Sequence, residues 1–297
     1  MKLFIVANPQ KPNVRRALDE WLPWMKERAQ VVGVDTDCCT DLSIADADVI
    51  LALGGDGTLL AAARRLKGKP TPLMGVNFGR LGYLAGFSPA HFREDFEALV
   101  AGKLKISSRL ALEASLIGAD ARIDPFDVAQ VARARTTVAT ALNDAVVTAG
   151  PPFHMIELEI QAGSESGGVR FFGDGVIAAT PSGSTAYNLS AGGPIVDAGV
   201  EAFCLTPVCP HSLSFRPVVV SSRNSVVLVA SKVNPGTTLF CDGQETAVLR
   251  GGDRVVIHRS PHDVKLIENP QASPWRSLAE KLNWAATPRY NDSGNDG

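Results

Sequence analysis

Apolar runs alternate with amphipathic, helix-forming stretches through the N-terminal third of the chain. The apolar runs carry few polar positions, as strands do when both faces of a parallel sheet are covered. They lie at residues 2–7, 31–34, 48–53 and 72–77. Helical periodicity marks residues 13–28, 58–66 and 88–100. This order predicts a three-layer α/β, Rossmann-like N-terminal domain built around a parallel sheet.

The pattern changes after Gly102, where short strand candidates are separated by Gly, Pro, Asn and Ser residues. Punctuation of this kind is typical of an all-β domain, and we expect a β-sandwich-like C-terminal domain. Residues 118–135 and 163–168 interrupt it as surface excursions, and residues 274–286 return to helical character. The strand candidates lie at residues 105–117, 138–148, 154–161, 175–179, 203–207, 217–221, 225–230, 238–242, 254–259 and 264–268.

The turn Gly54-Gly55-Asp56-Gly57-Thr58 joins an apolar run to the helix-forming stretch that follows it. Its glycines leave the backbone amides open to a ligand, and a helix N-terminus favours negative charge, so phosphate is the expected ligand. The carboxylate of Asp56 would repel a phosphate lying directly on it. We therefore expect Asp56 to face a hydroxyl beside the phosphate and to remove its proton, which predicts a kinase.

The competing interpretation of this turn is an ordinary β–α connection in which Asp56 caps the helix. Two other nucleotide-binding patterns do not match. The pattern Gly-x4-Gly-Lys-Ser/Thr is absent from the turn. Leu60 occupies the last glycine position of a Gly-x-Gly-x-x-Gly pattern that would begin at Gly55.

The turn resembles the signature that NAD kinases share with diacylglycerol and sphingosine kinases and, more loosely, with 6-phosphofructokinases. A second motif, Gly-Asp-Gly-Val-Ile-Ala-Ala-Thr-Pro-Ser-Gly-Ser-Thr-Ala-Tyr-Asn-Leu-Ser-Ala-Gly-Gly-Pro at residues 173–194, resembles the hallmark of NAD kinases alone. Shorter similarities to that family lie at residues 79–84, 142–147 and 241–244. The resemblance spans residues 1–285 and is poorest over residues 118–137.

This resemblance implies transfer of a terminal phosphoryl group to the 2′-hydroxyl of the adenosine ribose of NAD, which yields NADP. The donor is ATP or polyphosphate, and Mg²⁺ is expected to arrive with the donor phosphates rather than at a metal site of the protein. In the family a terminal helix packs back on the first domain. We therefore expect an α/β domain of residues 1–103 plus 270–297 and an all-β, NAD-binding domain of residues 104–269.

The resemblance also implies which residues bind the substrates. Asp56 matches the catalytic base, and Asn143-Asp144 match a pair that binds the adenine edge and the ribose hydroxyls. Asp174 matches an aspartate near the nicotinamide ribose that reaches the site from a neighbouring subunit, which implies a homodimer or homotetramer. Further NAD contacts are expected from Gly57, His154, Thr185, Ala186, Tyr187, Asn188, Leu189, Ser190 and Gln244. The donor phosphates are expected at Gly54, Gly55, Gly57, Thr58 and Arg80.

Several of these residues have ordinary structural interpretations. Residues 184–190 are typical of a helix capped by Ser184, and Gln244 of a hairpin turn. His154 is nearly as well explained as an exposed residue at a strand start, and Arg80 as a solvated loop residue. One position departs from the family, since Phe172 stands where many relatives have Arg; Arg170, on the same strand face, is the candidate substitute.

Composition supports a two-domain enzyme without a nucleic-acid or membrane partner. The chain has 297 residues, and its 29 Lys and Arg against 31 Asp and Glu give a net charge of −2. The N-terminal apolar run is too short for a signal peptide, so we expect a cytoplasmic protein. Its five cysteines include no Cys-x-x-Cys pair and are expected to be reduced. The alternatives are a lipid kinase and a non-catalytic NAD-binding sensor.

Overall fold

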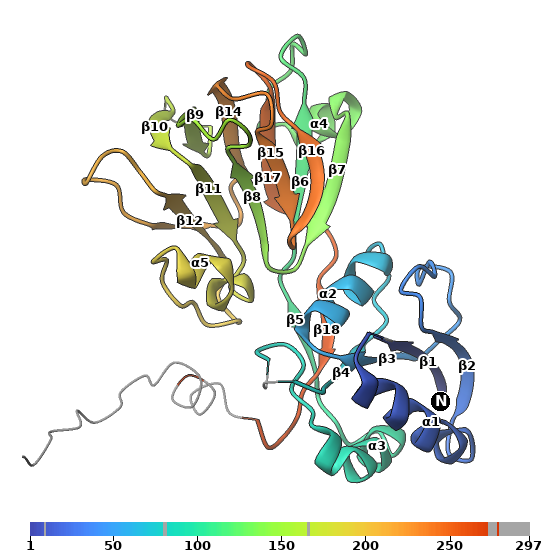
Figure 1. Cartoon of the computed structure of the whole chain (residues 1–297). Helices are drawn as coiled ribbons and strands as arrows, with labels where there is room; N and C mark the ends of the chain where they lie inside the picture. The colour runs from blue at the N-terminus through green and yellow to red at the C-terminus, as the bar shows by residue number, and fades with distance from the viewer. Residues whose placement is uncertain (9, 80–81, 165–166, 273–277, 279–297) are drawn as a thin grey trace, which may run out of the picture.

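The computed structural model describes every residue except 9, 80–81, 165–166, 273–277 and 279–297. It consists of an α/β domain and a β-sandwich joined by two chain crossings (Figure 1). This architecture confirms the predicted fold class. The predicted terminal helix at residues 274–286, with its packing on the first domain, lies outside the described residues.

The α/β domain is built on one six-stranded sheet with strand order β2-β1-β3-β4-β18-β5. The first four strands are parallel, β18 is parallel to β4, and β5 is antiparallel to β18. The strands are β1 (Lys2–Ala7), β2 (Gln30–Asp35), β3 (Val49–Gly54), β4 (Leu73–Asn77), β5 (Ile106–Arg109) and β18 (Val264–Ile267).

Helices cover both faces of this sheet, which explains why its central strands β1, β3 and β4 are buried along nearly their whole length. On β1, Leu3 and Ile5 pack under α1 and α3, whereas Phe4 and Val6 pack under α2. Proline stands at the first position of α1 and of the short helix η1, where its missing N–H costs no hydrogen bond. The helices are α1 (Pro12–Lys26), α2 (Asp56–Arg65), η1 (Pro89–His91) and α3 (Phe92–Val100).

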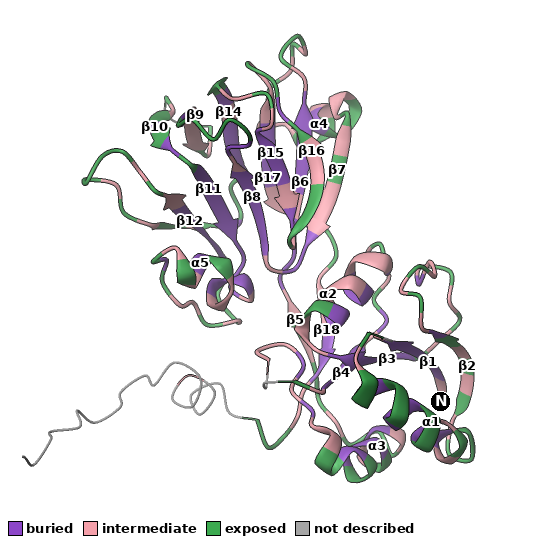
Figure 2. Ribbon diagram, in the orientation of Figure 1, coloured by how far each residue is buried: buried purple, intermediate pink, exposed green. Residues whose placement is uncertain are grey.

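The sandwich consists of two six-stranded sheets, with orders β10-β9-β14-β17-β6-β7 and β13-β12-β11-β8-β15-β16. Alternate residues of each sheet, such as Leu112, Ala114 and Leu116 of β6, point into one shared apolar core. Figure 2 shows this burial along the central strands. The strands are β6 (Leu112–Ile117), β7 (Thr137–Ala141), β8 (Asp144–Thr148), β9 (Ile156–Ala162), β10 (Val169–Gly173), β11 (Gly175–Ala179), β12 (Ala202–Val208), β13 (Val218–Ser221), β14 (Val226–Lys232), β15 (Thr238–Cys241), β16 (Gln244–Val248) and β17 (Arg254–Arg259).

Two predicted strands were wrong because the chain changes sheet within each. The strand predicted at residues 105–117 is β5 followed by β6, and the one predicted at 138–148 is β7 followed by β8. The predicted domain limits shift for the same reason. Because β5 and β18 pair within the α/β sheet, the chain crosses between domains at residues 110–111 and 260–263 rather than at 103 and 269.

Three further elements were not predicted. These are the edge strands β10 and β16, and the helix α4 (Val128–Ala134) within the predicted surface excursion. Asp127 caps α4 by accepting hydrogen bonds from the backbone amides of Ala129 and Gln130. No helix in the described ranges combines the length and the apolar character that a bilayer crossing requires.

Candidate functional site

The glycine-rich turn lies between the end of β3 and the start of α2, as the sequence predicted. Gly55 is the helix N-cap and Asp56 is the first helical residue. A side chain at Gly54 would lie 2.1 Å from the hydroxyl of Thr58, whereas one at Gly57 would meet no other described residue within 4 Å. The turn borders a cavity of about 340 Å³ lined by Asn8, Lys11, Gly55, Asp56, Gly57, Thr58, Asn77, Gly79 and Gly82.

The carboxylate of Asp56 is bound by the loop that follows β4. Its Oδ2 accepts the amide of Tyr83 at 2.8 Å, and its Oδ1 accepts the amides of Ala85 at 2.8 Å and Leu84 at 3.3 Å. Asp56 is therefore not the N-cap of α2, because its side chain accepts hydrogen bonds from the loop after β4 and not from the amides of the helix. A carboxylate has about four lone-pair sites, so these three bonds leave Oδ2 with room for one further hydrogen bond.

Gly82 makes this arrangement possible. A side chain at Gly82 would lie 1.9 Å from Oδ1 of Asp56, so only glycine lets the backbone approach the carboxylate this closely. Gly82 was not among the predicted site residues, although it stands in the motif at residues 79–84.

The Asn143-Asp144 pair lies where the chain leaves β7 in one sheet and enters β8 in the other. The carboxylate of Asp242 holds this crossing by accepting the backbone amides of Leu142 at 2.9 Å, Asn143 at 2.7 Å and Asp144 at 3.3 Å. In return, the amide of Asp242 donates to the carbonyl oxygen of Asp144 at 3.0 Å.

Asp242 itself stands in the two-residue turn between β15 and β16. Asp242 and Gly243 have φ values of 49° and 71°, the left-handed conformation that such a hairpin turn requires. Asp and Gly are among the residues that adopt this conformation most readily. This turn places Gln244 at the end of the sandwich that carries Asp144, and it confirms the hairpin interpretation of the Asp-Gly-Gln sequence.

The carboxylate of Asp144 and the side-chain oxygen of Asn143 are buried, and interactions within the protein do not fully replace the contacts that each would make with water. Burial, together with the nearby charge of Asp242, raises the pKa of Asp144 to about 7. The side-chain oxygen of Asn143 is buried and has no hydrogen-bond partner among the described residues. Buried polar groups without partners are costly, so both groups are suited to accept hydrogen bonds from a ligand.

The Asn143-Asp144 crossing packs against the helix that begins at the glycine-rich turn. Leu142 is 2% exposed and belongs to the apolar cluster that includes Leu59 and Ala62 of α2. Burial raises the pKa of Asp242, while the backbone hydrogen bonds that it accepts and, more weakly, the positive charge of Arg64 near the end of α2 act in the opposite direction. The two predicted halves of the site therefore meet on α2, one from each domain (Figure 1).

The segment of the second motif also reaches this crossing. The amide of Thr180 donates to the carbonyl oxygen of Asn143 at 2.8 Å, and a side chain at Gly183 would lie 2.0 Å from that same oxygen. Of the residues predicted to bind NAD here, Tyr187 is 46% exposed. The hydroxyl of Thr185 donates to the carbonyl oxygen of Ser182 at 3.3 Å.

Two side chains of this segment have structural roles. Ser184 was predicted to cap a helix, but it is buried within the short helix η2 (Gly183–Thr185), and the single-turn helix α5 (Tyr187–Ser190) has Ala186 at its N-cap. The side-chain nitrogen of Asn188 donates to the carbonyl oxygens of Ser184 and Pro194, each at 3.0 Å. Its side-chain oxygen accepts the hydroxyl of Thr206 at 2.6 Å. The side chain of Asn188 therefore holds the segment in place.

Asp174 and His154 lie away from this site within one chain. On β11, Ala179 pairs with Asp144, whereas Gly175 pairs with Thr148 at the far end of the strand. Asp174 precedes Gly175, so it lies roughly 16 Å along the sheet from Asp144 at about 3.3 Å per residue. His154 is exposed near that far end, and its carbonyl oxygen accepts a hydrogen bond from Asn234.

The structure places Arg170 and Phe172 on the same exposed face of β10, as predicted. A guanidinium nitrogen of Arg170 lies 3.8 Å from the carboxylate of Glu157 on β9. Arg80, the predicted donor-phosphate contact, lies outside the described residues. Lys11 and Asn8 line the cavity and were not predicted. The available signal was that β1 and β3 are parallel neighbours, so the loop after β1 lies at the same edge of the sheet as the turn after β3.

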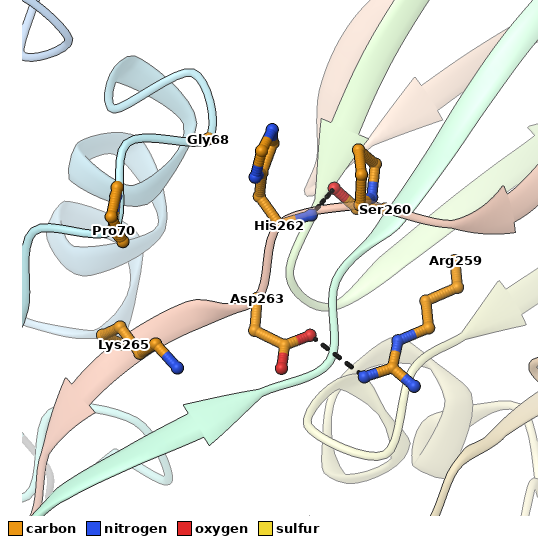
Figure 3. A pocket seen from close by; sticks show the side chains of 8 residues that line it. Gly68, Pro70, Arg259, Ser260, His262, Asp263 and Lys265 are labelled. Atoms are coloured by element: carbon orange, nitrogen blue, oxygen red, sulfur yellow. Dashed lines mark hydrogen bonds and ion pairs between the residues drawn. The ribbon is translucent and has the colours of Figure 1, made fainter.

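A second cavity, of about 540 Å³, lies beside the crossing at residues 260–263 (Figure 3). Its lining includes His262, Asp263 and Arg259, and the last two form an ion pair at 3.3 Å. None of the residues that the sequence predicted for the substrates lines this cavity.

A parallel α/β domain with an open glycine-rich turn, packed through its helix against a polar pair of a β-sandwich, defines a two-domain phosphotransferase. The model of the ATP-NAD kinase N-terminal domain matches residues 34–104, and that of the ATP-NAD kinase C-terminal domain matches residues 142–269. The chain belongs to the NAD kinase family, and its activity is phosphorylation of NAD to NADP with ATP. Membership confirms the resemblance and decides against a lipid kinase.

Similar proteins cover nearly the whole chain. The NAD kinase of Rhodopirellula baltica is 35% identical over 284 residues, which cover 96% of this chain and 87% of that protein. The NAD kinase of Desulforamulus reducens is 37% identical over 289 residues, with 94% and 96% coverage. The structure of yeast NADH kinase complexed with NADH has a TM-score of 0.84 at 25% identity, covering 97% and 89% of the chains. An NAD kinase from Archaeoglobus fulgidus in complex with ATP gives 0.74 at 25% identity, with 95% and 99% coverage.

Proposed function

We propose that Asp56 is the general base of the NAD kinase reaction and accepts the proton of the adenosine-ribose 2′-hydroxyl. The open position on its Oδ2 provides the acceptor, while the loop after β4 fixes the direction of the carboxylate. The packing of the Asn143-Asp144 crossing against α2 is the observation that carries this proposal. It brings a pair suited to bind a ribose and a turn suited to bind a phosphate to the same helix.

The acceptor nucleotide is proposed to bind along the Asn143-Asp144 crossing. Ionised Asp144 accepts hydrogen bonds from the ribose hydroxyls, and the buried oxygen of Asn143 accepts one from the adenine amino group. Tyr187 offers an exposed ring for stacking. Thr185, Ala186, Leu189, Ser190 and Gln244 are the further proposed contacts, while Asn188 acts as a scaffold.

The proposed donor is MgATP, in which the phosphate oxygens would hold the ion. Among the described residues no group of three or more His, Cys, Asp or Glu side chains could hold a metal ion. Transfer of the terminal phosphoryl group needs placement and neutralisation of charge rather than covalent catalysis. Gly54, Gly55, Gly57 and Thr58 supply the amides and the hydroxyl at the start of α2.

We propose that the enzyme acts as a homodimer or homotetramer, in which Asp174 and His154 of one subunit complete the nicotinamide side of another subunit's site. The separation of Asp174 from Asp144 along β11 supports this proposal, because one dinucleotide bound at Asp144 needs a partner for its far end. A cytoplasmic location is also proposed, since all five cysteines are free thiols in the structure, as expected in a reducing compartment.

Replacement of Asp56 by Asn tests the role of the base. With MgATP and NAD at saturation, NADP formation by the D56N variant should fall by about 10²–10⁴-fold. Calorimetry should show nearly unchanged NAD affinity, because the ribose contacts remain. The exposed Asp19 on α1 provides the matched control D19N, which should keep the wild-type rate. A D56N rate within a few-fold of wild type would assign the proton to another acceptor.

A further inference from the structure

Lys11 places a positive charge directly over the glycine-rich turn. It is the last residue of the loop between β1 and α1, and its Nζ donates to the carbonyl oxygen of Gly54 at 3.1 Å. The same nitrogen lies 3.3 Å from the position that a side-chain carbon of Gly55 would occupy, and 3.7 Å from that of Gly79. The ammonium group therefore lies between the turn after β3 and the loop after β4.

No carboxylate among the described residues pairs with the charge of Lys11. Among the residues lining this cavity in the described part of the chain, Lys11 is the one cation and Asp56 the one anion. The carboxylate of Asp56 is turned toward the amides of residues 83–85, and no ion pair of Lys11 is found among the described residues. An ammonium group has three donors. One is used at Gly54, and no second hydrogen bond of the ammonium group is found among the described residues.

The loop that carries Lys11 is shaped to hold it there. The side-chain oxygen of Asn8 accepts the amide of Gln10 at 3.0 Å, and the backbone oxygen of Asn8 accepts the amide of Lys11 at 3.3 Å. These bonds form a compact turn directly before α1. Pro12, at the first position of α1, then fixes the direction in which the helix leaves.

We propose that Lys11 binds the terminal phosphates of the nucleotide donor and neutralises their charge during transfer. The assignment rests on the proposed function of the glycine-rich turn as the donor site. Bare amides at a helix start and a neighbouring ammonium group are complementary to a polyanion such as a triphosphate. Lys11 thus supplies the cation of the donor site, and Asp56 serves the acceptor hydroxyl on the other side of the turn.

The test compares K11M and K11R with wild type in a full titration of MgATP and of NAD. Met keeps the length of the side chain and removes the charge. The KM for MgATP of K11M should rise by about 10- to 100-fold, with little change in the KM for NAD. K11R, which keeps the charge, should recover part of the loss. Lys26, exposed at the other end of α1, gives the control K26M, which should match wild type.

A binding measurement separates contact with phosphate from a structural role. K11M should lose affinity for a non-hydrolysable ATP analogue, while its NAD affinity and its melting temperature stay near the wild-type values. If K11M and wild type had equal KM values for MgATP, the assignment of Lys11 would be overturned, whereas the proposed function would stand. Joint loss of NAD affinity and of thermal stability would likewise overturn it, because Lys11 would then only tie the loop to Gly54. Failure of the proposed function would instead appear as a D56N rate within a few-fold of the wild-type rate.

Discussion

The carboxylate of Asp242 accepts the backbone amide of Asn143 at 2.7 Å, although the two residues are 99 positions apart in the chain. Together with the amides of Leu142 and Asp144, this bond fixes the crossing between the two sheets of the sandwich. Because the acceptor of these three amides comes from a distant part of the chain, no hydrogen bond within the crossing itself can replace it. The geometry of the Asn143-Asp144 pair, proposed above to bind NAD, therefore depends on a residue in a distant hairpin.

The D242N variant should lose both stability and NAD affinity. Asn accepts the left-handed backbone of the turn, but it lacks the charge and offers one acceptor oxygen instead of two. We expect the free energy of unfolding to fall by about 1.5–3 kcal/mol, measured by urea denaturation, and calorimetry to show weaker binding of NAD. The control is D127N at the N-cap of α4, where Asn caps as well as Asp. Unchanged NAD affinity in D242N would show that the crossing keeps its shape unaided.

Asp144 should make the stability of the ligand-free enzyme fall as the pH rises. Its pKa is raised from the ordinary value of 3.8 to about 7 in the folded protein, so the folded state binds the proton more tightly than the unfolded chain. This contribution to the free energy of unfolding is complete below about pH 4 and is lost as the pH rises through about 7. It amounts to at most about 4 kcal/mol. Thermal melting of wild type and D144N between pH 4 and 8 measures it.

The D144N variant should show the smaller pH dependence, because Asn cannot ionise, and its melting temperature should exceed that of wild type increasingly toward pH 8. D19N, which removes an exposed carboxylate, should follow wild type across the range. NAD binding should release a proton near pH 6, since ribose hydroxyls donate to the ionised carboxylate. Parallel pH profiles of D144N and wild type would place the titrating group elsewhere.

Gly82 and Gly57 should respond differently to alanine. In G82A the added carbon would lie 1.9 Å from Oδ1 of Asp56, so the carboxylate or the loop must move. We expect a loss of about 1–3 kcal/mol of stability together with most of the turnover. In G57A the added carbon meets no other described residue within 4 Å. That variant should keep its stability and lose donor affinity, because the methyl group projects into the cavity. G118A, whose added carbon also meets nothing within 4 Å, is the control.

The sequence predicted both domains because their strands carry different patterns. The buried runs of the α/β sheet are apolar at each position, while the sandwich strands are short and punctuated. The changes of sheet could not be predicted, because buried apolar residues also stand where the chain changes sheet. Leu110 and Ala111 at the first change and Leu142 at the second are 7%, 0% and 2% exposed.

The site was predictable as far as its residues form local motifs. Asp56 and the Asn143-Asp144 pair stand in short, recognisable stretches, and the structure brings these stretches together on α2. The contributions of Lys11, Gly82 and Asp242 arise from contacts between separate loops, which no local pattern encodes. For Asn188 the pattern pointed to the ligand, whereas three hydrogen bonds within the protein already occupy its side chain.

Mixing two impaired variants tests whether Asp174 acts across a subunit interface. D174A should lower NAD affinity, and D56N should lower turnover. If Asp174 completes a neighbouring subunit's site, a mixed oligomer of the two variants contains sites that combine an intact Asp56 from the D174A chain with an intact Asp174 from the D56N chain. Co-expression with two affinity tags and tandem purification yields such oligomers. Their NADP formation should exceed the sum of the two separate variants, whereas a rate equal to that sum would show that Asp174 serves its own chain or none.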